Sequence, residues 1–299
     1  MIRLPEYPNV NFLNFEDENE VKKFMDGDGV NDADPLYKYA PWKFAKQSLT
    51  DRYLWMSNPS VWNDPFEDYF LAAKYVDTHG TEIDFPYKNK VFCNCLTPDN
   101  NSEAHWITYA KKQVGVCLRI NVKELVERLN GFGRANPNLG IYLGKVTYLK
   151  QSEIQAKRIQ DIPLYEDTKG RTVVRDINNP DFCANLLLLK RKAFKHDNEV
   201  RLIIVQENEE PKGMRFQYDY DASGFTIPNY LNEKLFDLVF TSPFHGEDKR
   251  DSIRKELEKK KYGFNRITIH YASGKTGLRS RIQRSRLYDR VKSKKIKLY

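Results

Sequence analysis

Short apolar runs separated by turn residues recur along the whole chain. Such runs predict strands, because successive side chains of a strand point to opposite faces of a sheet. The expected strands are Leu36–Tyr39, Tyr53–Ser57, Val91–Cys95, Gly115–Ile120, Lys145–Leu149, Glu199–Val205, Met214–Tyr220, Leu235–Thr241 and Arg266–Tyr271.

Fewer segments show the apolar spacing of three to four residues that is typical of a helix. Ser102 is the expected N-cap of a helix that continues to Lys112, and Asn121 with Glu124 resembles a capping box for a helix that ends near Gly131. The other expected helices are Glu16–Met25, Pro180–Lys195 and the segment near Asp248–Tyr262. Many short strands with a few packed helices predict an α+β fold, a single domain with mixed, mostly antiparallel sheets around one core.

Composition agrees with a globular chain. Of the 299 residues, 40% are hydrophobic and 30% are charged, and no apolar run approaches the ~20 residues of a membrane-spanning helix. The first residues lack the basic start and apolar stretch of a signal peptide, so we expect a cytoplasmic protein without a membrane contact. The four cysteines lack zinc-ligand spacing, and we expect them to be free thiols.

Charge is distributed unevenly and suggests three segments. Residues 1–34 hold nine acids and three bases. Residues 275–299 hold ten Lys or Arg and one Asp, so this +9, set against the whole chain's +8, leaves −1 for everything before it. We therefore expect an acidic N-terminal segment (1–34), an α+β domain (35–273) with a polar insertion near 151–179, and a basic C-terminal tail (274–299).

The tail is the expected contact for nucleic acid. Lysines and arginines that neutralise phosphates supply salt-dependent binding to nucleic acid. A basic helix and a solvated tail that packs against the acidic segment or a partner protein remain alternatives. The candidate nucleic-acid-binding residues are Arg279, Arg281, Arg284, Arg286 and Arg290.

Two polar clusters and one aromatic cluster are candidates for chemistry. Residues 57–67 form a proline-framed polar loop that directly follows a strand, which is either a binding loop or ordinary turn chemistry. Glu199 and Arg201 share one face at the start of an apolar strand, as a ligand site or a structural ion pair. Trp106 and Tyr109 could wall a pocket for a flat ring or belong to the core. Phosphate-binding loops, serine-nucleophile motifs and zinc motifs are absent from the sequence.

In this order the segments resemble a bacterial family that is designated only as a domain of unknown function, number twenty-nine seventy-one. The resemblance spans roughly residues 35–275. It rests on Leu36-Tyr37-Lys38-Tyr39, Leu54-Trp55-Met56-Ser57-Asn58-Pro59, Asn63-Asp64-Pro65-Phe66-Glu67, Cys93-Asn94-Cys95, the Trp106…Tyr109 helix with Gly115, and Glu199-x-Arg201.

That family is similar in layout to ADP-ribosyltransferase-like toxins and to proteins of abortive-infection and phage-defence loci. The resemblance implies NAD as substrate, with a late-strand Glu199 as catalytic residue and Ser57 and Tyr39 in support. It implies that Lys38, Asn63, Asp64, Trp106, Tyr109 and Arg201 bind the cofactor.

The chemistry fits these residue types. Breaking the nicotinamide–ribose bond passes through an oxocarbenium-like cation, which a preorganised carboxylate stabilises. Asp64 or Glu67 could activate the acceptor. The alternative is a non-catalytic module that binds nucleic acid or a partner protein of a defence system. A third reading is a metal-dependent nuclease that uses Asp64, Glu67 and Glu199.

Overall fold

The computed structural model describes residues 2–3, 21–25, 34–62, 64, 66–77, 79–100, 102–110, 114–155, 159–164, 166–167, 175–207, 219–220, 224–227, 235–258 and 282–284. The chain divides into two compact units. Unit 1 comprises residues 1–31, 55–95 and 126–227, and unit 2 comprises residues 32–54, 96–125 and 228–299. The expected α+β class with antiparallel sheets and packed helices is confirmed.

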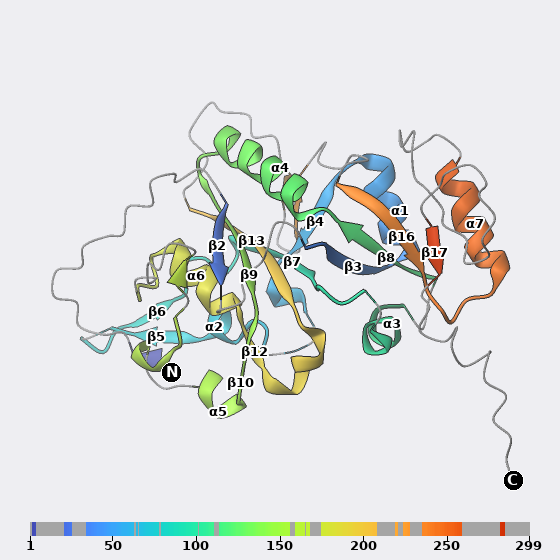
Figure 1. Ribbon diagram of the computed structural model, residues 1–299. Helices are drawn as coiled ribbons and strands as arrows, with labels where there is room; N and C mark the ends of the chain where they lie inside the picture. The colour runs from blue at the N-terminus through green and yellow to red at the C-terminus, as the bar shows by residue number, and fades with distance from the viewer. Residues whose placement is uncertain are drawn as a thin grey trace, which may run out of the picture. The chain divides into compact units, whose positions relative to one another are not determined.

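Unit 1 is organised around an eight-stranded sheet (Figure 1). Its strands, in spatial order, are β11 (Glu166–Asp167), β2 (Lys22–Met25), β9 (Leu139–Lys145), β13 (Val200–Gln206), β7 (Val91–Leu96), β4 (Leu54–Ser57), β15 (Gly224–Ile227) and β14 (Asp219–Tyr220). Strand β13 pairs with β9 in antiparallel register over seven residues. Every residue of β13 is buried, and its centre, Leu202–Val205, is a continuous apolar run. Such a run is typical of a central strand that is covered on both faces.

Two smaller sheets and several short helices complete unit 1. The additional strands are β1 (Ile2–Arg3), β5 (Lys74–Val76), β6 (Glu82–Asp84), β10 (Thr147–Leu149) and β12 (Leu189–Arg191). The helices are α2 (Tyr69–Ala72), α5 (Gln151–Ile154), α6 (Pro180–Leu187) and the 3₁₀ turns η1 (Pro59–Val61), η2 (Ile159–Asp161) and η3 (Lys192–Asp197). Helix α6 begins at Pro180, and the Asn179 side chain accepts a hydrogen bond from the Asp181 N–H as its N-cap.

Unit 2 contains a four-stranded sheet of its own. The strand order is β17 (Ile282–Arg284), β16 (Phe236–Thr241), β8 (Gly115–Ile120) and β3 (Leu36–Pro41). Its helices are α1 (Trp42–Asp51), α3 (Glu103–Ala110) and α7 (Glu247–Glu258), while α4 (Val122–Ala135) follows β8 and lies mostly within the unit 1 residues. The expected caps are confirmed, since Ser102 Oγ accepts from His105 N at 3.3 Å and Asn121 Oδ1 from Glu124 N at 3.1 Å.

Three helix predictions need correction. The Pro180–Lys195 helix is wrong beyond α6, because residues 189–191 leave the helix to pair in parallel with β10. The Glu16–Met25 helix is wrong over Lys22–Met25, which form strand β2 beside β9. In both places pairing with a distant strand overrides the local helical pattern. Within the tail, residues 282–284 form β17 instead of the helical alternative.

Other differences concern elements that the pattern missed. Helix α1 was not expected, although Trp42, Ala45 and Leu49 bury one face of it at helical spacing. Strand β9 was missed because its continuous apolar run contains two glycines, Gly140 and Gly144. The strand expected at Arg266–Tyr271 and most of the one expected at Met214–Tyr220 lie outside the described residues.

The sheet of unit 1 includes a close approach to the Trp55 ring that requires glycine at position 224. A Cβ atom at Gly224 would lie 2.0 Å from Cζ2 of the Trp55 ring, which is far inside van der Waals contact. We expect Gly224→Ala to lower the free energy of unfolding by about 1–3 kcal/mol, because the ring or strand must shift. Urea unfolding of the purified protein measures this loss.

A matched glycine and a second background serve as controls. Gly131 lies in helix α4 with no heavy atom within 4 Å of an added Cβ, so Gly131→Ala should stabilise by about 0.5–1 kcal/mol. In a Trp55→Ala background the cost of Gly224→Ala should largely disappear. An equal cost in both backgrounds would contradict the steric explanation.

Candidate functional site

Four segments of unit 1 bring charged side chains together in one buried cluster. We call it the ionic cluster. The loop between β4 and α2 contributes two acids, β12 contributes two cations and η3 contributes one acid. A Glu precedes β13 directly, and an Arg is the second residue of that strand. Its members are Asp64, Glu67, Lys190, Arg191, Asp197, Glu199 and Arg201.

Arg201 is the most deeply buried member. Its charged side chain is 0% exposed and lies in β13, a strand that is otherwise mostly apolar. Nε donates to Glu199 Oε1 at 2.6 Å, Nη1 donates to the Leu187 carbonyl at 2.6 Å, and Nη2 donates to Glu67 Oε2. All three guanidinium nitrogens are therefore engaged, as burial of a charge requires.

Lys190 is shared by three carboxylates. Its Nζ lies 2.8 Å from Glu67 Oε1, 2.9 Å from Asp197 Oδ2 and 2.7 Å from Glu199 Oε2. Both oxygen atoms of Glu199 thus face a cation, and the Glu199 side chain is only 5% exposed. The Glu199 backbone is fixed as well, because its N–H donates to Tyr148 Oη at 2.8 Å.

The edge of the ionic cluster is more exposed. Arg191 is 26% exposed and pairs with Asp64 through Nη2 at 2.8 Å and Nε at 3.3 Å. His196 is 51% exposed, and its Nε2 lies 3.4 Å from Asp197 Oδ1. This edge is therefore the solvent-accessible part of the cluster.

Every cation of the cluster also faces an aromatic ring. Arg201 lies 5.0 Å from the Trp62 centroid, Arg191 4.4 Å from that of Phe66, and Lys190 5.1 Å from that of Phe194. Such contacts add electrostatic attraction where water is excluded. Ser57 belongs to the same construction, because its Oγ accepts the Trp62 indole N–H at 2.7 Å.

The ion pairs shift the protonation equilibria. Burial raises the pKa of Glu199, but the charges of Arg201 and Lys190 outweigh it and hold this pKa below its ordinary value. Burial lowers the pKa of Lys190, but Glu199 and Glu67 raise it above the ordinary value. The Glu199 contribution to stability is therefore present above about pH 4.3 and is lost as pH falls, and the Lys190 contribution is lost only as pH rises above about 10.4.

The other predicted site residues that the structure describes belong to unit 2, where three of them, Tyr39, Trp106 and Tyr109, contribute to an aromatic cluster. Tyr39 stacks on His105 at 4.9 Å and meets the Trp106 ring edge-on at 4.8 Å. Its hydroxyl donates to the Asp99 carbonyl at 3.0 Å, and burial raises its pKa above the ordinary value. Tyr109 is partly exposed and stacks on His105, while Lys38 is half-buried in β3.

Several predicted residues cannot be placed. Asn63 and the tail residues Arg279, Arg281, Arg286 and Arg290 lie outside the described residues, and only the backbone of Arg284 is described. Of the predicted residues, the ionic cluster unites Asp64, Glu199 and Arg201, and Ser57 is linked to it through Trp62. Sequence reasoning missed Trp62, Lys190, Arg191 and Asp197; the one signal was the Lys190-Arg191 pair directly after a run of four leucines.

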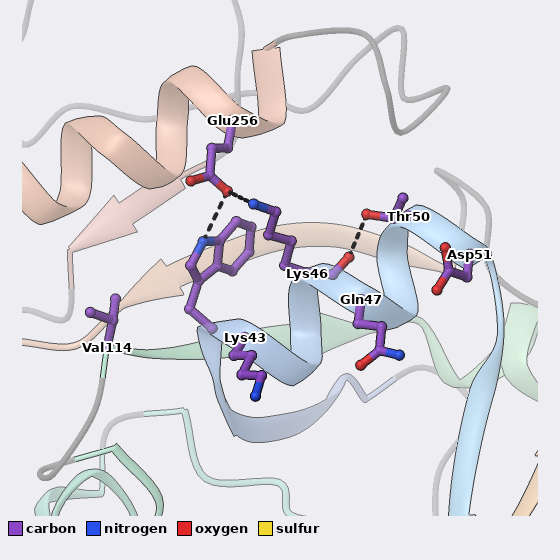
Figure 2. Close-up of a pocket in the computed structure, with 8 residues that line it drawn as sticks. Lys43, Lys46, Gln47, Thr50, Asp51, Val114 and Glu256 are labelled. Carbon is purple, nitrogen blue, oxygen red and sulfur yellow. Dashed lines mark hydrogen bonds and ion pairs between the residues drawn. The ribbon is translucent and has the colours of Figure 1, made fainter.

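Unit 2 also holds an open groove between α1 and α7, shown in Figure 2. Its volume is about 620 Å³, and its eight lining residues include none of the predicted site residues. Lys46 pairs with Glu256 at 2.8 Å across the groove, and the Trp42 indole N–H donates to the same carboxylate at 3.3 Å. The Lys46–Glu256 ion pair joins α1 to α7.

Comparison with known proteins supports the family resemblance. A family model described as "Protein of unknown function (DUF2971)" matches residues 105–202, which include Lys190, Glu199 and Arg201. The predicted resemblance to this family is confirmed over this segment. No curated protein and no solved structure matches the chain.

The described residues contain neither a membrane-spanning helix nor a group of metal ligands. Within the described ranges, no helix has the length and apolar character needed to cross a bilayer. In the same part of the chain, no three His, Cys, Asp or Glu side chains are grouped to hold a metal ion. None of the four cysteines forms a disulfide, and Cys93, Cys117 and Cys183 are buried, as expected of free thiols.

Removal of the shared cation tests the energetics of the ionic cluster. We expect Lys190→Met to lower the free energy of unfolding by about 3–5 kcal/mol at neutral pH, because three buried carboxylates lose a partner. The loss should shrink toward acid pH, where these carboxylates take up protons. Urea unfolding across a pH series measures both effects.

Lys74→Met is the matched control. Lys74 also forms a close ion pair, with Asp84 at 2.5 Å, but both side chains are more than half exposed. Exposed pairs contribute about 0–1 kcal/mol, so this variant should change stability little. Equal effects of the two substitutions would show that the ionic cluster is not a buried, mutually dependent network.

Proposed function

We propose that the protein is an NAD-using, ADP-ribosyltransferase-like enzyme in which Glu199 is the catalytic carboxylate. The observation that carries the proposal is the convergence of Ser57, Asp64, Glu199 and Arg201 in one cluster of unit 1. These residues come from segments more than a hundred positions apart, and each lies in a motif of the family resemblance.

The electrostatics of Glu199 suit this role. Its lowered pKa keeps the carboxylate charged, and Arg201, Lys190 and Tyr148 fix its position before any ligand arrives. A fixed negative charge stabilises an oxocarbenium-like cation without reorganisation during the reaction. Because Glu199 is almost fully buried, the ribose would have to reach it through the exposed edge of the cluster.

Arg191 suits the phosphate contact better than Arg201. Arg201 has no exposed surface, and each of its three guanidinium nitrogens already donates to an acceptor of the protein. Arg191 is partly exposed, and Phe66 supports the flat face of its guanidinium. Arg191 Nε and Nη2 now donate to Asp64, so a pyrophosphate would compete with Asp64 for this planar donor on the solvent side of the cluster.

The acceptor we propose is nucleic acid, held by the basic tail, in a cytoplasmic effector of anti-phage or toxin-type defence. The defence role follows from the family resemblance alone. The tail's net charge of +9 supports a polyanionic partner.

A non-catalytic module is the second candidate. The observation that favours it is the complete pairing of Glu199, whose two oxygens both contact cations of the protein. Such a network can serve stability and specificity of the fold without any chemistry. The module would then bind nucleic acid or a partner protein of a defence system.

NAD consumption by the purified protein, with and without mixed DNA and RNA, separates the two candidates. For the enzyme we expect turnover that Glu199→Gln lowers by about 10²–10³-fold, the loss typical of removing one preorganised electrostatic contact. Asp181→Asn is the matched control, since Asp181 is a buried acid of the same unit that accepts a hydrogen bond from Tyr142 at 2.7 Å. Thermal unfolding verifies that both variants are folded.

The outcomes are distinct. Turnover that survives Glu199→Gln removes Glu199 from catalysis. Turnover lost equally in both variants indicates a fold defect. Absence of turnover in the unaltered protein, under every condition, favours the non-catalytic module.

The tail is tested by its salt dependence. Reversing Arg279, Arg281, Arg284 and Arg286 to Glu should abolish binding to mixed-sequence DNA at physiological salt and flatten the slope of log affinity against log salt. Fluorescence anisotropy across a salt series measures this slope. Replacing Lys43, Lys46, Lys74 and Lys88 by Glu is the control of equal charge change outside the tail. If the two sets weaken binding equally, only net charge matters and the tail holds no specific contact.

A further inference from the structure

We propose that Trp62 is a positioning residue that holds the Arg201 guanidinium against Glu199, and that Ser57 acts through Trp62. The catalytic meaning of this inference rests on the proposed function, but the positioning itself does not. It gives Ser57 a role that differs from direct contact with NAD.

Trp62 is anchored to the central sheet of unit 1. Its indole N–H donates to Ser57 Oγ at 2.7 Å, and the Ser57 hydroxyl donates in turn to the Cys93 carbonyl at 3.4 Å. Ser57 and Cys93 are paired residues of the adjacent strands β4 and β7. The ring orientation is therefore fixed by two strands and not by the loop alone.

The ring in turn covers Arg201. The guanidinium carbon lies 5.0 Å from the ring centroid, and Arg201 has no exposed surface. A cation that is desolvated against an indole face gains cation–π attraction, and exclusion of water strengthens its ion pairs. Trp62 thus reinforces the Arg201–Glu199 contact without touching Glu199.

Orientation matters because two glutamates compete for the same guanidinium. Nε donates to Glu199 at 2.6 Å while Nη2 donates to Glu67, with a longer contact of 3.4 Å to Glu199 Oε2. A turn of the guanidinium plane would give Glu67 contacts that Glu199 now has. A flat ring against one face resists that turn, which keeps the Glu199 carboxylate in place.

Hydrogen exchange of the Arg201 Nε–H measures this positioning without any substrate. We would record ¹H–¹⁵N spectra of the full chain and assign the signal with Arg201→Lys. Trp62→Leu removes the aromatic face, Trp62→Phe removes only the N–H donor, and Ser57→Ala removes its acceptor. The backbone amides of Leu202 and Ile203 in β13 report whether the strand itself has loosened.

We expect Trp62→Leu to lower Arg201 Nε–H protection about tenfold, equivalent to ~1.4 kcal/mol, with β13 amide protection unchanged. Trp62→Phe and Ser57→Ala should have smaller and similar effects. Their double variant should be no worse than either single one, because both remove the same hydrogen bond.

Unchanged Nε–H protection in Trp62→Leu would overturn the proposal. So would additive effects of Ser57→Ala and Trp62→Phe, or parallel loss of protection at Nε–H and the β13 amides. If the unaltered protein consumes NAD, Trp62→Leu should lower kcat with little change in KM. If it does not, the exchange data still decide the positioning role, and only the proposed enzyme fails.

Discussion

The need to neutralise Arg201 inside an apolar strand governs the architecture of unit 1. An unpaired buried charge costs more free energy than the net stability of a folded domain, so acidic side chains must lie next to it. Glu199 directly precedes β13, the strand that contains Arg201, and Glu67 lies in a loop more than a hundred positions earlier in the chain. The Leu187 carbonyl at the end of α6 is the third acceptor, so three chain segments meet at Arg201.

The same constraint explains the path of the chain after α6. Two acids, Glu67 and Glu199, around one arginine leave excess negative charge, and Lys190 brings a second buried cation that also pairs with Asp197. A continuous helix through Lys195 would follow the local leucine pattern, but residues 189–191 instead run as β12 beside β10. In this strand Lys190 pairs with the buried carboxylates, and Arg191 pairs with Asp64 at the edge of the cluster.

The ionic cluster combines two properties that are often separate. Its interior is closed, with charges matched and aromatic faces against the cations, which favours rigidity. Its edge is open at Arg191 and His196. A rigid charged interior with an accessible edge is what an enzyme that stabilises a developing cation needs, and the proposed function depends on whether a ligand can use that edge.

The sequence by itself determined much of the local structure: the strands β3, β4, β7, β8, β13 and β16 and the caps at Ser102 and Asn121. These features depend on periodicity and on neighbours within a few positions. Only the tertiary structure decided that Lys190 leaves a helix, that Trp62 covers Arg201, and that Ser57 binds Trp62. It also divided the predicted NAD residues between two units, with Tyr39 and Trp106 in unit 2. The physical reason is that partners of buried charges, and pairings between distant strands, are chosen by the free energy of the whole packed core, which no local pattern encodes.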